Sequence, residues 1–158
     1  MNFTMSLSHL TGTRKHLASQ LAFFDEQHPI FLDTYFQEYG KERQQIDKLL
    51  RDYIRQLESI LLSDDQAFAE SLERIALIGS SVTVKYLDDG DEEEYTLVYP
   101  TEADPDRNRI SFFSPIGIHL LMASVGEEKV IDSPSSRYPI RIERVRFAYI
   151  GEFTRYSA

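Results

Sequence analysis

Residues 110–121 read ISFFSPIGIHLL, and this stretch decides how the second half of the chain folds. Ser114 followed by Pro115 predicts the start of a short helix, because an N-cap serine accepts a hydrogen bond from an unpaired amide and proline has no amide to leave unpaired. A short apolar face follows, formed by Ile116, Leu120 and Leu121. Gly126, just beyond, is expected to end the helix.

Around this helix the apolar residues alternate with a period of two, which predicts β-strands. We expect strands near residues 82–86, 95–99, 110–113, 130–131 and 140–149. The sequence DDGD at residues 88–91 predicts a hairpin turn. The alternation changes phase between Ile142 and Val145, which indicates a β-bulge. Strands with one short helix predict an antiparallel α+β domain over residues 79–158.

The first part of the chain, residues 1–62, has the apolar period of helices instead. Two heptad seams are expected to pair with each other as a coiled coil. The later seam consists of Ile46, Leu50, Tyr53, Leu57 and Ile60. The earlier seam consists of Leu10, Leu17, Leu21, Phe24, His28, Phe31 and Tyr35, with Arg14 interrupting it.

Gly40 is the strongest break in this helical region, and it predicts an antiparallel hairpin whose turn lies between residues 36 and 43. The earlier seam keeps its phase across Pro29, so we interpret Pro29 as a kink inside one helix. The alternative is that a new helix starts at Pro29. Residues 63–78 form a linker, in which residues 67–76 are expected to be a short helix.

Composition limits the function. The chain has 158 residues, 42% hydrophobic and 27% charged, with no cysteine and a formal net charge of -9. No apolar run approaches the roughly 18 residues of a membrane helix, and the absence of cysteine fits a reducing cytoplasm. The negative charge argues against binding to nucleic acid driven by phosphate neutralisation.

The ordered landmarks of residues 79–150 resemble the C-terminal domain of the GreA/GreB family of bacterial transcription elongation factors. They include residues 102–104 (EAD), 110–111 (IS), 114–117 (SPIG), 120–121 (LL) and 126–127 (GE). The resemblance implies an FKBP-like fold that binds RNA polymerase at the secondary-channel rim, on a coiled coil of the largest catalytic subunit. The loop entering the Ser-Pro helix takes part in that contact in the family, which implies polymerase-binding roles for Phe113, Ser114, Pro115 and Ile116.

The hairpin resembles Gre factors in architecture, but its tip departs from them. Gre factors carry a Gly-Asp-x-x-Glu-Asn element, whose two carboxylates help to hold a catalytic magnesium ion in the polymerase. The expected tip here contains Glu38, Tyr39, Gly40, Lys41 and Glu42. Its two glutamates are not part of a Gly-Asp-x-x-Glu-Asn element, and they lie beside basic residues. The hairpin is also shorter than that of Gre factors. The expectation is a variant similar to the regulator of nucleoside diphosphate kinase, which binds polymerase without stimulating transcript cleavage.

No residue set predicts a catalytic centre, a metal site or a cofactor. His9 and His16 could share a helix face, but they lack a third ligand. Lys48, Arg51 and Arg55 form a basic stripe that could contact nucleic acid inside the polymerase, although intervening carboxylates favour a salt-bridged surface. The chain is therefore expected to be a non-enzymatic regulator. The alternatives are a working cleavage factor and, from the FKBP-like fold alone, an isomerase or chaperone module.

Overall fold

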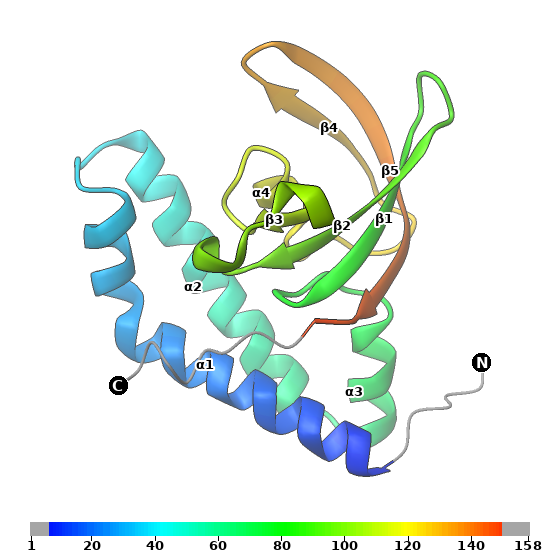
Figure 1. Cartoon of the computed structure of the whole chain (residues 1–158). Helices are drawn as coiled ribbons and strands as arrows, with labels where there is room; N and C mark the ends of the chain where they lie inside the picture. Colours follow the sequence, from blue (N-terminus) through cyan, green and yellow to red (C-terminus); the bar gives the residue numbers. More distant parts are fainter. Residues whose placement is uncertain (1–6, 150–158) are drawn as a thin grey trace. The chain divides into compact units, whose positions relative to one another are not determined.

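The computed structural model describes residues 7–149 of the chain (Figure 1). These residues divide into two compact units, one ending at Ala69 and the other beginning at Glu70. The first unit is helical and the second contains a five-stranded sheet. The predicted α+β class, a helical hairpin followed by a sheet domain, is therefore confirmed.

The first unit is an antiparallel helical hairpin. Helix α1 spans Leu7–Tyr35 and helix α2 spans Lys41–Leu62. The turn between them occupies residues 36–40, where the sequence predicts it. The α2 helix of 22 residues is about 33 Å long at 1.5 Å per residue. The first unit therefore has the predicted form of a long finger with Gly40 at its tip.

Pro29 lies inside α1 and does not begin a new helix. Because proline has no amide hydrogen and its ring collides with the carbonyl four residues earlier, it bends a helix without necessarily ending it. Figure 1 shows α1 changing direction between its first half and the tip of the hairpin. The interpretation of one kinked helix is confirmed.

The two seams differ in how well the sequence predicts them. All five residues of the α2 seam are buried, as expected. In α1, Leu17, Phe24 and Phe31 are buried, but Leu21 is only half-buried and Tyr35 is 36% exposed. The additional buried positions in α1 are Phe23, Leu32 and the polar residues Thr13 and Gln20, whereas assigning Leu21 to the core was wrong.

Gln20 can be buried because its side-chain amide has a hydrogen-bond partner on α2. The hydroxyl of Tyr53 donates a hydrogen bond to the Gln20 Oε1 atom, and both side chains are fully buried. A buried amide with a partner is far less costly than one without. The apolar pattern alone could not place this residue in the core.

Replacing Tyr53 with phenylalanine should lower the free energy of unfolding by about 1–3 kcal/mol, because Gln20 loses a donor where water cannot replace it. The double variant Tyr53→Phe with Gln20→Met, which removes both polar partners, should recover most of that loss. Urea unfolding monitored by circular dichroism measures both values. Equal destabilisation of the single and double variants would contradict a favourable Gln20–Tyr53 hydrogen bond.

Arg14, which interrupts the predicted α1 seam, connects the ends of the helical unit. Its guanidinium donates to the carbonyl oxygens of Leu61 at 2.7 Å and Ser63 at 3.2 Å. It also lies 4.2 Å from the centre of the Phe68 ring. Because the last carbonyls of a helix have no partner within it, Arg14 stabilises the C-terminal end of α2.

Helix α3 spans Asp65–Leu72, so the expected range of 67–76 is wrong at both ends. The helix starts earlier because the Asp64 carboxylate accepts from the Ala67 amide at 2.8 Å, which is an N-cap. It ends earlier because Ile75 forms an isolated bridge with Ser124. The backbone amide of Ala76 then donates to the Ala123 carbonyl at 2.9 Å.

The second unit contains one sheet with the strand order β3-β2-β1-β5-β4. Its strands are β1 (Ser80–Tyr86), β2 (Glu92–Val98), β3 (Arg109–Ser111), β4 (Glu128–Ser133) and β5 (Ser136–Phe147). Short 3-10 turns at Pro100–Glu102 and Pro105–Arg107 connect β2 to β3. Helix α4 (Gly117–Leu120) follows β3 and lies on one face of the curved sheet (Figure 1).

The predicted hairpin turn and bulge are both present. Gly90 has a φ of 82°, and its amide donates to the Tyr86 carbonyl at 2.8 Å. A positive φ is readily available to glycine, which explains this residue in the turn. Thr83 pairs with Arg144 and Val84 with Ile142, which leaves Glu143 as the extra residue of the bulge.

The expected all-antiparallel sheet is wrong at one edge, because β3 runs parallel to β2. The strand is also shorter than the expected 110–113. After Ser111 the chain turns, since the Ser114 amide donates back to the Ser111 carbonyl at 3.0 Å. Three residues carry too little alternation for the sequence to reveal their direction.

Candidate functional site

The Ser-Pro loop, defined here as residues 112–116, connects β3 to α4. The Ser114 hydroxyl donates to the Ser111 carbonyl at 2.8 Å and accepts from the Gly117 amide at 3.0 Å. The Ile118 amide donates to the Ser114 carbonyl at 3.0 Å, which is the first bond of a helical turn. Ser114 therefore caps the turn that leads into α4 through its side chain, but the regular helix begins only at Gly117, so placing Pro115 at the first helical position was wrong.

Gly117 explains why the loop is so tight. A Cβ atom there would overlap the Ser111 carbonyl oxygen, so any other residue would force the backbone apart. The four predicted binding residues lie together in this turn: Pro115 is exposed, while Phe113, Ser114 and Ile116 are half-buried. The fully buried Phe112 contacts Phe113 edge to face, with ring centres 5.4 Å apart. The loop is thus a fixed feature of the surface with a mainly apolar character.

Gly126 does not end α4, contrary to expectation. The helix stops at Leu120, and Met122 adopts a positive φ of 67° two residues later. Gly126 has a φ of 90° in the following turn, where its amide donates to the Ile142 carbonyl at 2.8 Å. Its role is therefore to bring the chain back to the sheet before β4.

The tip of the hairpin is organised by Arg43, a role that the sequence does not predict. Its guanidinium donates to the Phe36 carbonyl at 2.7 Å and to the Asp33 carboxylate at 2.8 Å. It also lies 4.3 Å from the centre of the Tyr39 ring. Three contacts with one planar cation hold the loop in place, because the guanidinium donates in fixed directions.

The acidic residues of the tip face solvent. Glu38 and Glu42 are both exposed, one in the loop and one in the first turn of α2. Lys41, between them in sequence, is also exposed. Over residues 7–149, no group of three or more histidine, aspartate or glutamate side chains is placed to hold a metal ion. His9 and His16 thus have no third ligand in the described part of the chain.

His28 lies beside the kink and bonds across the hairpin. Its Nε2 atom is 2.5 Å from the Asp47 Oδ1 atom, and the Arg51 Nε atom donates to Asp47 Oδ2 at 3.1 Å. Partial burial opposes ionisation of Asp47, but the hydrogen bonds and charges of Arg51 and His28 outweigh it and lower the pKa of this carboxyl. The ionised Asp47 carboxylate therefore stabilises the folded state.

Because the pKa of Asp47 is lower in the folded state, its stabilising contribution is complete above the unfolded value of about 3.9. The contribution disappears as the pH falls through the lower folded value. The variant Asp47→Asn should thus be less stable than the native chain at neutral pH, and the difference should shrink in acid. Urea unfolding across pH measures this difference.

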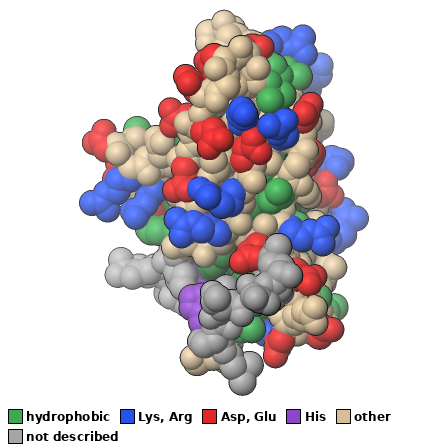
Figure 2. Space-filling model, turned by 90° about the vertical axis from the view of Figure 1, so that its right-hand side faces the viewer, with side chains coloured by type: hydrophobic (Ala, Val, Ile, Leu, Met, Phe, Trp, Pro, Cys, Tyr) green, Lys and Arg blue, Asp and Glu red, His purple; other side chains and the backbone are tan. Residues whose placement is uncertain are grey.

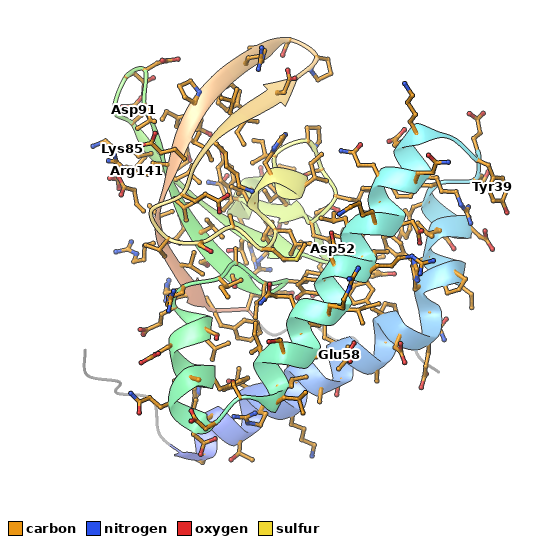
Figure 3. The ribbon with its side chains drawn as sticks, turned by 180° about the vertical axis from the view of Figure 1, so that it is seen from behind. Tyr39, Asp52, Glu58, Lys85, Asp91 and Arg141 are labelled. Atoms are coloured by element: carbon orange, nitrogen blue, oxygen red, sulfur yellow. The ribbon has the colours of Figure 1, made fainter. Side chains whose placement is uncertain are left out.

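Glu58→Gln is the matched control, because it removes an exposed acidic charge from the same helix (Figure 3). It should change stability much less than Asp47→Asn. A pH-independent difference for Asp47→Asn would contradict the assignment.

The basic stripe of α2 is a salt-bridged surface, as the sequence favoured. Lys48 contacts Asp52 at 2.7 Å, and Arg55 contacts the same carboxylate at 3.1 Å. Figure 3 shows Asp52 and Glu58 on the same helix. Exposed ion pairs of this kind contribute little stability, about 0–1 kcal/mol each. Most of the stripe's positive charge is already matched by neighbouring carboxylates.

The sheet unit has the same mixture of charges. Arg141 contacts Glu143 at 3.0 Å and Glu128 at 3.8 Å. Figure 2 shows acidic and basic side chains interspersed on the face that it presents. The negative net charge is therefore not gathered into one acidic area on that face. Among residues 7–149, no helix is long and apolar enough to cross a membrane.

Comparisons with known proteins agree with both units. The family model described as "Transcription elongation factor, GreA/GreB, C-term" matches residues 73–147. A transcription elongation factor GreA from Chloroflexus aggregans is 36% identical over 146 residues, which cover 89% of this chain and 88% of that protein. The GreA of Bacillus cytotoxicus is 44% identical over 72 residues, 46% of each chain.

A solved structure extends the comparison to the fold. The GreA/GreB elongation factor from Nitrosomonas europaea superposes with a TM-score of 0.53 at 25% identity, covering 77% of this chain and 93% of that one. The Chloroflexus match spans too much of the sequence to be confined to the sheet unit. The chain belongs to the GreA/GreB family of transcription elongation factors.

Proposed function

We propose that this protein is a Gre-type regulator that binds bacterial RNA polymerase at the rim of its secondary channel. The Ser-Pro loop would supply the contact, through Phe113, Ser114, Pro115 and Ile116, on the largest catalytic subunit. The hairpin would enter or obstruct the channel. Its relatives are named transcription elongation factors, which supports transcription as the process. We place the protein in the cytoplasm with the polymerase.

We further propose that the protein does not stimulate transcript cleavage and is not an enzyme. The observation that carries this proposal is the Arg43-centred tip. Magnesium requires oxygen ligands at about 2.0–2.1 Å in near-octahedral geometry. At this tip Arg43 engages the Asp33 carboxylate, and Lys41 lies between Glu38 and Glu42 in sequence. The tip therefore offers a mixture of charges where a cleavage factor needs converging carboxylates.

The experiment is a cleavage assay on backtracked elongation complexes of the cognate polymerase. The full chain should co-purify with the polymerase and leave the rate of RNA cleavage unchanged. An authentic cleavage factor of the same polymerase serves as the positive control. Strong stimulation would support the alternative of a working Gre factor, and failure to bind polymerase would overturn the proposal as a whole.

A further inference from the structure

One face of the sheet carries three arginines of β5, namely Arg141, Arg144 and Arg146. The register pairs them in turn with every second residue of β1, namely Lys85, Thr83 and Ser81. Alternate residues of a strand point to the same face, and so do directly paired residues, so all six side chains share what we call the arginine face. The bulge at Glu143 produces this alignment, since without the extra residue Arg141 and Arg144 would point to opposite faces.

Carboxylates neutralise one end of the arginine face. Arg141 contacts Glu143 at 3.0 Å and Glu128 at 3.8 Å. Lys85 lies beside Arg141, as Figure 3 shows, and it is directly opposite Glu92 of β2. This end of the face therefore has no excess of positive charge.

The other end of the arginine face is basic and accessible. Arg144 and Arg146 are both exposed, and neither forms an ion pair with another residue that the structure describes. Across the sheet from Arg144 the first acid is Glu94, which lies opposite Thr83 and is therefore two strands away. Because neighbouring strands are about 4.8 Å apart, the backbones of Arg144 and Glu94 are separated by about 10 Å.

The row of residues that crosses the sheet from Arg146 consists of basic and uncharged side chains. It passes through Ser81 of β1 and Thr96 of β2 to Arg109 of β3. The hydroxyls of Ser81 and Thr96 are hydrogen-bonded to each other at 3.0 Å. The Arg109 guanidinium lies 4.3 Å from the centre of the Tyr149 ring. The positive charge of Arg146 is thus not offset along this row.

We propose that Arg144 and Arg146 bind an extended acidic segment of a partner protein, in which two carboxylates are two residues apart. Two residues of an extended strand span about 6.4–6.8 Å, so alternate carboxylates of such a segment match the spacing of the two arginines. A guanidinium can bind each carboxylate through two parallel hydrogen bonds. Nucleic acid is a poorer match, because a chain with a net charge of -9 repels a long row of phosphates more than it repels two carboxylates.

The test is a nuclear magnetic resonance titration of the isotope-labelled full chain with the capped peptide GETEG, whose carboxylates have this spacing. Arg144→Gln and Arg146→Gln should each weaken binding about 2- to 5-fold, the size of one exposed ion pair, and the double variant about 4- to 25-fold. The peptide GQTQG, which lacks the carboxylates, should not bind. Because both arginines are exposed, these variants remove no core side chain.

Arg137→Gln is the matched control on the same strand. It removes the same charge from the chain, but Arg137 lies 3.7 Å from Asp132 and belongs to the part of β5 that pairs with β4. It should change the affinity for GETEG by less than about twofold, because a distant exposed charge is screened by salt.

Two results would overturn this inference directly. One is the absence of GETEG binding, and the other is an equal loss of affinity in Arg137→Gln and Arg146→Gln, which would make the attraction a property of overall charge. Tighter binding of oligothymidylate than of GETEG, with the same dependence on Arg144 and Arg146, would assign the face to nucleic acid and also overturn it.

Failure of this inference is distinguishable from failure of the proposed function, because the arginine face contains no residue of the Ser-Pro loop. The peptide titration uses the full chain without polymerase, so a negative result leaves the proposed polymerase contact intact. Loss of polymerase association by the native chain, with arginine-dependent binding of GETEG retained, would overturn only the proposed function.

Discussion

Replacing Phe113 and Pro115 together with glutamate should weaken binding to the cognate RNA polymerase by about 100-fold or more. Both side chains belong to the fixed turn that Ser114 and Gly117 create, and Pro115 is exposed. A hot-spot residue at the centre of an interface contributes about 2 kcal/mol or more, and each 1.4 kcal/mol is about a factor of ten. Burying two new carboxylates at the same contact adds a desolvation cost. Co-purification and a binding titration with purified polymerase measure the loss.

Two controls make this result interpretable. Phe113 contacts Phe112, so the double variant requires a thermal melt to show that the sheet unit remains folded. The single variant Pro115→Glu preserves the test if the double variant is unstable. Val125→Asp introduces a charge at a 43% exposed apolar residue of the same unit outside the Ser-Pro loop, and it should bind normally. Native affinity of a folded Phe113/Pro115 double variant would show that the proposed contact lies elsewhere.

The sequence predicts the hairpin well because both helices carry regular signals. The five α2 residues at alternating spacings of three and four are apolar and buried, and Gly40 marks the turn. It predicts the α1 core less well because Gln20 is buried through a hydrogen bond with Tyr53, which lies 33 residues away in sequence. Hydrophobic periodicity contains no information about two buried polar side chains that form a hydrogen bond with each other.

A similar limit applies to the second unit. The Ser114 cap was predictable because the capping bond is local, whereas the parallel pairing of β3 was not, because three residues carry too little alternation to reveal the direction of a strand. The role of Arg43 was also hidden. Its partners Asp33, Phe36 and Tyr39 lie across a turn, and only the folded loop brings them around one guanidinium.

The second large expected effect concerns RNA cleavage, and it follows from the positive charges at the hairpin tip around Arg43. The native chain should leave the cleavage rate of a backtracked complex within about twofold of the rate without a factor. A unit positive charge about 6 Å from a divalent cation costs about 1.4 kcal/mol in water, which is a tenfold loss of affinity. Lys41 and Arg43 both lie in the segment that would have to organise the metal.

For the same reason, the double variant Glu38→Ala with Glu42→Ala should behave as the native chain does in this assay. Occupancy of the channel by the native chain should instead appear as competition with an authentic cleavage factor. The rate of RNA cleavage that this factor stimulates should fall as the native chain is added. Pro115→Glu should relieve that competition because it weakens docking, and the two glutamate substitutions should not. Strong cleavage by the native chain that disappears in the glutamate double variant would restore the Gre mechanism, since it would show that two exposed carboxylates at a mixed-charge tip suffice to organise the ion.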